Sequence, residues 1–281
     1  TDERHILVTK EDATYQFGID YLRDVWYSTS YLLDRKQSMN GCAKKRFENY
    51  KEQPLEFVFD KSFTGKFSQY GITPERRTPT GIKAAIIREK GTNGEREMAY
   101  MLYLAGFDVK DVTMTDLISG RETLEDINMI VFCGGFSNSD VLGSAKGWAG
   151  AFLFNPKAKA ALDNFYARKD TLSLGVCNGC QLMIELGLIN PEHNKKAKML
   201  HNDSHKFESK FVGVTVPMNR SVMLGSLSGS KLGIWVAHGE GKFSLPYEED
   251  KYNVVLKYSY DEYPGNPNGS DYSVAGLASS D

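Results

Sequence analysis

Two of the four cysteines lie in the stretch Gly175-Val-Cys-Asn-Gly-Cys-Gln181, which directly follows an apolar run of strand type. Glycines two residues before and two residues after Cys177 permit a tight turn from strand to helix, where side chains would otherwise collide. A cysteine on that turn lies at a helix N-terminus, whose dipole favours thiolate over thiol. The amide of Asn178 is then placed to donate to an oxyanion. The pattern is G-x-S-x-G with cysteine for serine, and it predicts a nucleophile at Cys177.

Other interpretations of this cysteine pair stay open. A Cys-x-x-Cys pair is also half of a zinc site or a redox motif, but Cys42 and Cys133 are single and distant in the sequence. Structural burial remains an interpretation for Cys180 above all, because it follows Cys177 by one helical turn and could face the core. We therefore expect no metal in this chain, with Cys177 as the nucleophile and Cys180 as a packing residue.

A second candidate is the loop Cys133-Gly-Gly-Phe-Ser137, which follows a predicted strand. Paired glycines expose backbone amides at the carboxyl edge of the sheet, where ligands bind in open α/β folds. Gly135 is a candidate for the second oxyanion donor. Taken alone, the loop is equally typical of an ordinary strand-to-helix connection, with Ser137 or Ser139 as the helix N-cap.

The elements that must position these groups alternate along the chain. Strand-type runs begin near Ile82, Phe107, Met129 and Leu172, and helical patterns cover residues 98–104, 148–154 and 158–166. This alternation indicates right-handed crossovers and a mainly parallel open sheet with helices on both faces, which is the α/β class. After about residue 205, short strands and polar turns predict an antiparallel edge of the sheet.

The first 80 residues have a different pattern. Apolar residues recur at mostly helical spacing and predict a long amphipathic helix from about Ala13 to Asp34, with enough aromatic surface to pack against something large. Residues 63–80, with two glycines and two prolines, predict an extended linker.

The composition restricts the setting and the partners. A net charge of −2 gives no basic field, so nucleic acid is not an expected partner. No apolar stretch approaches the roughly 18 residues needed to span a bilayer, and the charged N-terminus does not resemble a signal peptide. Four unevenly spaced cysteines do not form a secreted disulfide framework. We expect a cytoplasmic protein with neither nucleic acid nor membrane as a partner.

Three motifs together resemble a known family: Gly175–Gln181, Gly134-Gly-Phe-Ser137 and Asn266-Pro-Asn-Gly-Ser270. They are similar to the class I glutamine amidotransferase domain of phosphoribosylformylglycinamidine synthases, from about Ile82 to the last residue. The first 80 residues resemble the end of the synthetase portion and the linker in the large, single-chain members. The resemblance implies a flavodoxin-like sheet and two parts, residues 1–80 and residues 81–281, the second truncated at its C-terminus.

The resemblance also implies an activity. Cys177 would attack glutamine, form a glutamyl thioester and release ammonia, with the amides of Gly135 and Asn178 on the oxyanion. Gln181, Asn202, Ser204 and Phe207 match positions that hold glutamine. The synthetase domain of the same polypeptide would use the ammonia in the ATP-dependent conversion of formylglycinamide ribonucleotide to its amidine, in purine biosynthesis. ATP and Mg²⁺ belong to that synthetase, so we expect no cofactor in this chain.

The sequence departs from the family at the catalytic base. The family carries this base in a His-Pro-Glu motif beyond Asn-Pro-Asn-Gly-Ser, and the chain stops at Asp281 before such a motif. We therefore expect a truncated fragment with little activity. His238 and Glu240 have His-x-Glu spacing, but the family carries this segment as well, so we expect them to shape the pocket. A His238 nitrogen within about 4 Å of the Cys177 sulfur would contradict this expectation.

Two rival functions follow from the same residues. One is a non-catalytic, glutaminase-like interaction module that docks through the helix predicted at residues 13–34. The other is a cysteine hydrolase or redox-protective protein with the same sheet architecture.

Overall fold

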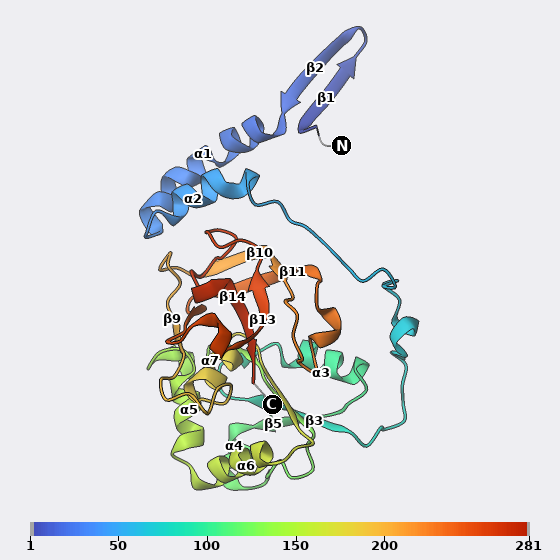
Figure 1. Ribbon diagram of the computed structural model, residues 1–281, viewed down its shortest axis with the longest axis vertical. Coiled ribbons are helices and arrows are strands. Elements are labelled where there is room, and N and C mark those ends of the chain that lie inside the picture. Colours follow the sequence, from blue (N-terminus) through green and yellow to red (C-terminus); the bar gives the residue numbers. More distant parts are fainter. Residues whose placement is uncertain (1–2, 280–281) are drawn as a thin grey trace. The chain divides into compact units, whose positions relative to one another are not determined.

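The computed structural model describes residues 3–279, which divide into two compact units (Figure 1). Unit 1 combines the chain up to Phe59 with Leu200–Ser244 and Val254–Leu277. Unit 2 combines Asp60–Met199 with Leu245–Asn253 and the stretch from Ala278 onward. The bounds of these units differ from the division at residue 80 that the family resemblance implies. That division stays a prediction.

Unit 2 contains a four-stranded sheet in the order β5-β3-β6-β8, in which all three strand pairs are parallel. Its strands are β3 (Lys83–Arg88), β5 (Asp108–Thr113), β6 (Met129–Phe132) and β8 (Leu172–Gly175). All four strands were predicted from the sequence, and the α/β class with a parallel sheet is confirmed.

Helices cover both faces of this sheet because both faces are apolar. In β3, Ala85 and Ile87 point into one core cluster while Ala84 and Ile86 point into the other. The helices of unit 2 are α3 (Glu95–Leu104), α4 (Met114–Ser119), α5 (Lys146–Leu153), α6 (Pro156–Ala167) and α7 (Asn178–Glu185). Residues of α3 pack into the second cluster, and residues of the other four helices pack into the first. Strands with two apolar faces are expected in a parallel sheet of this kind.

Local signals explain where individual helices begin and end. Asn155 caps α6 by accepting hydrogen bonds from the amides of Lys157 and Ala158, and Pro156 occupies the first turn. Gly106, in the left-handed region with φ of 100°, follows the end of α3 as the sequence predicted.

Unit 1 contains a second four-stranded sheet in the order β11-β10-β13-β14. Its strands are β10 (Glu208–Thr215), β11 (Lys231–His238), β13 (Asn253–Tyr258) and β14 (Val274–Ala278). β10 is antiparallel to β11 along its whole length and to β13 at its end. The predicted antiparallel strands therefore exist, but their placement at an edge of the parallel sheet was wrong. They pair among themselves and enclose their own core of Val212, Val214, Val236 and Tyr258.

The N-terminal segment of unit 1 corrects a second prediction. The long helix, α1 (Ile19–Gln37), begins six residues later than Ala13, because Ala13–Gly18 forms strand β2 and pairs with β1 (His5–Lys10). Tyr15 and Phe17 alternate along the strand, and β-branched and aromatic residues favour this conformation. Sequence periodicity counted Tyr15 and Ile19 as neighbours on a helix, since their spacing of four fits both interpretations. Helix α2 (Cys42–Glu48) follows α1.

The remaining elements are short. Residues 63–80 lack regular structure apart from a 3₁₀ turn, which agrees with the irregular backbone expected there, and their role as a linker stays a prediction. No helix among residues 3–279 has both the length and the apolar character required to cross a membrane. The other short strands are β4 (Thr92–Asn93), β7 (Gly134–Gly135), β9 (Lys198–Leu200) and β12 (Lys242–Ser244). The 3₁₀ helices are Asn49–Lys51, Phe67–Tyr70, Ser137–Asp140, Gly225–Leu227, Glu249–Lys251 and Asp271–Ser273.

Two phenylalanines in and just after α5 provide a test of where the core lies. Phe152 is 1% exposed and meets Phe132 edge-on at 6.0 Å, whereas Phe154 is 88% exposed. Phe152→Ala should lower the free energy of unfolding by about 3–5 kcal/mol because it leaves a cavity. Phe154→Ala should change it by less than about 0.5 kcal/mol. Urea unfolding followed by fluorescence measures both values, and equal effects would contradict this assignment of the core.

Candidate functional site

Cys177 lies between β8 and α7 with a backbone conformation that non-glycine residues rarely adopt. Its φ is 54° and its ψ is −112°. Such strain persists only where the surroundings fix the backbone. Here the Val176 amide donates to the Phe132 carbonyl at 3.2 Å, and the Gln181 amide donates to the Cys177 carbonyl at 3.0 Å. The predicted strand-to-helix turn is therefore present and is held on both sides of the cysteine.

Both glycines of the turn are required by close backbone approach. A Cβ on Gly179 would lie 2.0 Å from the Phe132 carbonyl oxygen. A Cβ on Gly175 would lie 2.5 Å from the Gly179 carbonyl oxygen. No side chain fits at these distances, so α7 packs against β6 and β8 through bare backbone.

Two backbone amides point at the sulfur of Cys177, and they belong to Gly135 and Asn178. These are the two residues that the sequence nominated as oxyanion donors. Gly134, next to them, is close to the cysteine as well, because a Cβ there would lie 3.2 Å from the Cβ of Cys177. The structure thus brings together the nucleophile candidate and both amide candidates. Their role in holding an oxyanion stays a prediction.

The Gly135 amide is positioned by a segment that sequence reasoning missed. Strand β7, formed by Gly134–Gly135, pairs antiparallel with β4, formed by Thr92–Asn93. The Phe136 amide donates to the Gly91 carbonyl at 2.9 Å. Gly135 has φ of 115°, and a Cβ on it would lie 2.6 Å from the Gly91 carbonyl oxygen. Gly91, which follows β3, was the one sign of this segment in the sequence. Its function becomes clear only from the pairing of β4 with β7.

The side chain of Asn178 connects this loop to α7. It is fully buried, and its oxygen accepts from the Ser137 amide at 3.1 Å. Its amide nitrogen donates to the Gln181 side-chain oxygen at 3.0 Å and to Asp140 at 3.3 Å. Gln181 therefore lies in the same cluster as Cys177, as predicted. The sequence offered Ser137 only as a helix N-cap and did not indicate this connecting role.

The net pKa direction of Cys177 is opposite to the one expected from the helix dipole. Burial raises the pKa of the Cys177 thiol, the amides of Gly135 and Asn178 partly offset this rise, and Asp140 adds to it. Desolvation disfavours the charged form more than two amide donors favour it. The dipole at the start of α7 therefore does not by itself set the direction of the pKa of Cys177.

The other cysteines of this unit have less reactive environments. Burial raises the pKa of Cys180 to about 12 and that of Cys133 to about 11. These values favour a packing role for Cys180 over a redox role, since the reactive species is the thiolate. Among residues 3–279, no group of three or more His, Cys, Asp or Glu side chains could hold a metal ion.

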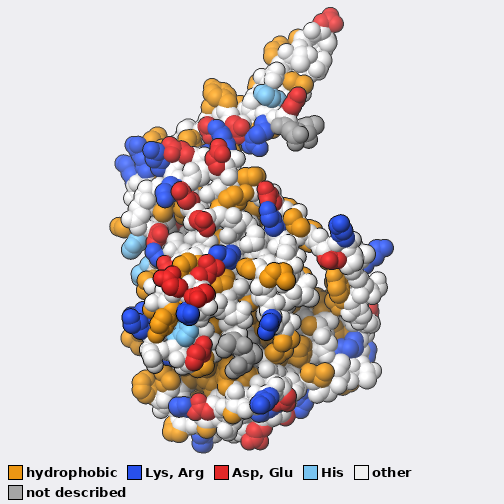
Figure 2. All heavy atoms as spheres, viewed as in Figure 1, with side chains coloured by type: hydrophobic (Ala, Val, Ile, Leu, Met, Phe, Trp, Pro, Cys, Tyr) orange, Lys and Arg blue, Asp and Glu red, His pale blue; other side chains and the backbone are white. Residues whose placement is uncertain are grey.

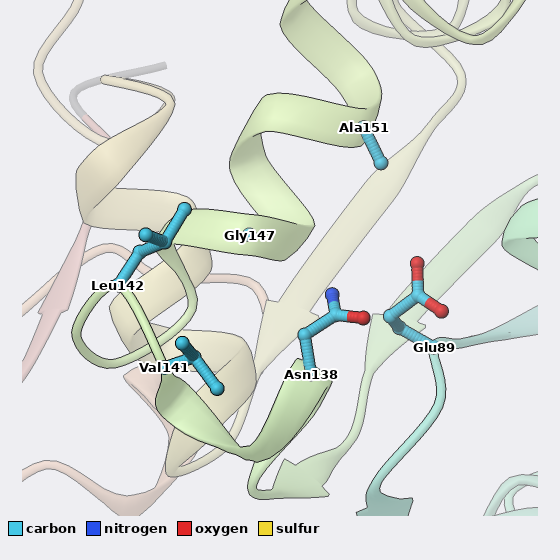
Figure 3. A pocket seen from close by; sticks show the side chains of 6 residues that line it. All are labelled: Glu89, Asn138, Val141, Leu142, Gly147 and Ala151. Atoms are coloured by element: carbon cyan, nitrogen blue, oxygen red, sulfur yellow. The ribbon is translucent and has the colours of Figure 1, made fainter.

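A pocket of about 530 Å³ lies beside the Gly135 loop (Figure 3). In Figure 3 the Asn138 side chain extends toward Glu89, whose carboxylate points away from it, and α5 contributes Gly147 and Ala151 to the lining. Val141 and Leu142, on the loop itself, are 79% and 72% exposed. The loop that carries a candidate oxyanion donor thus also presents an apolar surface.

The remaining predicted residues lie in unit 1, where Asn202 and Ser204 are fully buried and Phe207 is exposed. The Asn202 oxygen accepts from the Gly241 amide at 3.0 Å, and its nitrogen donates to the carbonyls of His238 and Lys206 at 2.8 and 3.1 Å. The Ser204 hydroxyl donates to Glu208 at 2.5 Å. Both side chains are therefore engaged inside unit 1. A role of Asn202, Ser204 and Phe207 in binding glutamine stays a prediction.

His238 and Glu240 belong to the turn that Asn202 holds. A Cβ on Gly241 would lie 2.1 Å from the His238 ring, so the turn closes tightly around the imidazole. The ring nitrogen Nδ1 is buried without a hydrogen-bond partner among residues 3–279. Burial lowers the pKa of His238, and Glu208 partly offsets this. Glu240 lies 4.0 Å from the His201 ring nitrogen. A pocket-shaping role for both residues stays a prediction.

The Asn-Pro-Asn-Gly-Ser motif supports the same part of unit 1. The Asn266 oxygen accepts from the amides of Gly269 and Ser270, both at 3.1 Å. The Asn268 nitrogen donates to the Gly241 carbonyl at 2.9 Å. A Cβ on Gly269 would lie 1.9 Å from a carboxylate oxygen of Asp203. The motif therefore fixes the backbone of two loops, a function that its sequence alone did not indicate.

Comparison with known proteins gives a consistent result. Residues 81–281 match the family model described as the CobB/CobQ-like glutamine amidotransferase domain. Phosphoribosylformylglycinamidine synthases of Drosophila melanogaster and Homo sapiens are 37% and 40% identical, over 100% and 92% of this chain. The alignments cover 22% and 21% of those relatives, so the chain spans about a fifth of their length. The solved structure of PurLQS from Thermotoga maritima is 29% identical with a TM-score of 0.56, over 71% of this chain and 82% of that one.

The glycine at position 179 gives a direct test of the turn. Gly179→Ala should destabilise the protein by about 1–3 kcal/mol or more, because the new methyl group meets the backbone of β6. Gly150→Ala, also within a helix, is the matched control, since its Cβ would meet only Phe154 at 3.7 Å. That control should be stabilising by about 0.5–1 kcal/mol. Thermal unfolding compares them; equal behaviour of the two variants would refute the close approach.

The raised pKa of Cys177 predicts how alkylation depends on pH. An ordinary thiol ionises at about pH 8.5, so the thiolate of Cys177 should form only above that value. Its rate of reaction with iodoacetamide should still rise beyond pH 9, while Cys180 stays unmodified over the same range. Mass spectrometry of the modified peptides measures both rates, with Cys177→Ser as the control. A rate that levels off below pH 8 would contradict the pKa direction.

Proposed function

Because the chain belongs to the family of CobB/CobQ-like glutamine amidotransferase domains, we propose that Cys177 attacks the side-chain amide of glutamine and releases its nitrogen as ammonia. The observation that carries this proposal is the convergence of the Gly135 and Asn178 amides on the cysteine sulfur. A nucleophile with two preorganised donors is the arrangement that acyl transfer requires.

The proposed reaction proceeds through two acyl transfers. The sulfur bonds to the amide carbon, and the carbonyl oxygen becomes an oxyanion that accepts from Gly135 and Asn178. The carbon–nitrogen bond then breaks, and the nitrogen leaves as ammonia with the proton that the thiol lost. Water hydrolyses the thioester to glutamate and returns a proton to Cys177. The amides stabilise the charge that develops in both steps, which is where such donors contribute most.

Proton transfer needs a base in addition to these residues. The pKa of Cys177 is raised, so the thiol does not ionise by itself near neutral pH. The His-Pro-Glu motif that the family resemblance implies does not occur among these 281 residues. We therefore expect this chain alone to react with an electrophilic glutamine analogue but to hydrolyse glutamine slowly.

Recognition of the rest of the substrate is proposed for Gln181 and for the segment from Asn202 to Phe207. Asn178 donates to the side-chain oxygen of Gln181, which supports a fixed orientation of that amide. The side chains of Asn202 and Ser204 are engaged within unit 1, so we assign their contribution to the backbone they hold. Phe207 is 48% exposed and supplies an apolar contact.

The proposed recipient of the ammonia is a synthetase domain of the same polypeptide. It would convert formylglycinamide ribonucleotide to its amidine with ATP and Mg²⁺, as a ligase of purine biosynthesis. Supporting this partner, α1 buries none of its 19 residues, all of them described, and its Trp26 is 80% exposed. Figure 2 shows hydrophobic side chains (orange) at the surface around this N-terminal segment. Exposed apolar surface of this kind marks sites of protein contact.

An electrophilic glutamine analogue tests the proposed function. In the full-length enzyme it should label Cys177 stoichiometrically, as read by mass spectrometry of the modified peptide. Cys180→Ala should keep the labelling and Cys177→Ala should abolish it. Labelling that survives Cys177→Ala, or that Cys180→Ala removes, would refute the proposed glutaminase activity and favour a different cysteine chemistry. Absence of any labelling would favour the non-catalytic interaction module.

A further inference from the structure

The turn between α1 and α2 is bonded directly to the segment Asn202–Glu208, and both lie in unit 1. The Met39 amide donates to the Ser204 carbonyl at 3.0 Å. The Asn40 side chain donates to the Asp203 carbonyl at 2.8 Å. Two consecutive carbonyls of this segment are thus satisfied by a turn more than 160 residues earlier in the chain.

A chain of charges runs parallel to these hydrogen bonds. Asp34, on α1, accepts from Lys206 at 2.5 Å and from Arg46 at 2.6 Å. Arg46, on α2, also donates to Glu208 at 3.3 Å. Burial opposes ionisation of Asp34, but Lys206, Ser38 and Arg46 together hold the pKa of Asp34 below its usual value. The side chains of Asp34 and Glu208 are only 14% and 1% exposed, so these pairs are shielded from water more than surface ion pairs are.

Glu208 connects this chain of charges to the segment Asn202–Glu208. Its carboxylate accepts from the Ser204 hydroxyl at 2.5 Å, from Lys210 at 2.7 Å and from the Tyr263 hydroxyl at 3.0 Å. A buried carboxylate with this many donors has a fixed position, since moving it would leave charges unpaired. Ser204 is therefore held from its side chain by Glu208 and from its carbonyl by Met39.

Charge and hydrogen bonding together imply that α1 sets the shape of the segment. Lys206 pairs with Asp34 at 2.5 Å, and the Lys206 carbonyl accepts from the Asn202 side chain at 3.1 Å. Without the carboxylate of Asp34, the positive charges of Lys206 and Arg46 would repel each other. The backbone between Asn202 and Glu208 would then keep the hydrogen bonds from the α1–α2 turn but lose the chain of charges.

We propose that Asp34 is a positioning residue for glutamine, which acts through Lys206 and Arg46 on the backbone of Asn202–Phe207. This inference rests on the proposed function, which assigns that segment to the substrate. It places a determinant of glutamine affinity outside residues 81–281, the part that matches the amidotransferase family. The glutaminase would thus depend on the segment that we propose to contact the synthetase.

Asp34→Asn in the full-length enzyme tests the proposal, because it removes the charge and keeps the side-chain shape. The KM for glutamine should rise on the order of tenfold, the size expected for loss of a charged hydrogen bond. The kcat with ammonium chloride in place of glutamine should stay unchanged, since ammonia bypasses the segment. A purely structural defect would lower both activities.

The matched control is Asp24→Asn, on the same helix. Asp24 pairs with Arg23 at 3.1 Å and with Lys51 at 3.4 Å, and its side chain is 36% exposed. This variant should leave the KM for glutamine unchanged. A KM within twofold of wild type for Asp34→Asn, or an equal rise for Asp24→Asn, would overturn the proposal.

A second variant covers the case in which Asp34→Asn fails to fold. Asn40→Ala removes only the hydrogen bond to the Asp203 carbonyl and should raise the KM for glutamine about two- to fivefold, in line with loss of one neutral hydrogen bond. An unchanged KM in that variant would also count against the proposal.

Labelling of Cys177 by the glutamine analogue distinguishes failure of the Asp34 proposal from failure of the proposed function. If Cys177 is labelled while the KM values stay unchanged, only the role of Asp34 is refuted. If Cys177 is not labelled, the proposed function itself fails.

Discussion

The close approach of α7 to β6 is the constraint on which the candidate site depends. Gly179 lies so near the Phe132 carbonyl that a single methyl group would overlap it, and Gly175 meets Gly179 in the same way. This packing leaves Cys177 with a positive φ and directs its side chain back toward two amides. The energetic cost of that strain is borne by the apolar cluster around the sheet, which fixes both elements. The backbone conformation at Cys177 is thus a consequence of how helix and sheet pack.

Desolvation and hydrogen bonding act against each other at Cys177. The packing that creates the turn also removes water from the thiol, and this raises its pKa despite two amide donors. The same donors are suited to a negative oxygen that forms only during reaction. In the proposed reaction, these donors would therefore act on a charge that develops in the transition state more than on a resting thiolate. A neutral thiol at rest also protects the cysteine from oxidation, since oxidation proceeds through the thiolate.

Unit 1 shows how buried polar groups can hold the backbone of loops in place. Asn202 and Asn268 both bind the backbone of Gly241, and Asn266 accepts from amides of its own turn. Glu208 accepts from four donors. Removing one member would leave buried charges or amides unsatisfied, so the network behaves as a unit. Residues that sequence comparison would assign to substrate contact, such as Asn202 and Ser204, are instead occupied by this internal support. Their proposed contribution to binding lies in the backbone geometry that they maintain.

The sequence alone determined the parallel sheet, its helices other than α4 and the turn at Cys177, because these depend on apolar periodicity and on glycines at fixed local spacing. It also indicated the Gly135 loop and the family. Only the tertiary structure decided that residues 13–18 pair as a strand, that the antiparallel strands form their own sheet, and that Asp34 reaches Lys206. Those features join residues far apart in the chain, and the burial that raises the pKa of Cys177 likewise comes from surrounding atoms that no local pattern specifies.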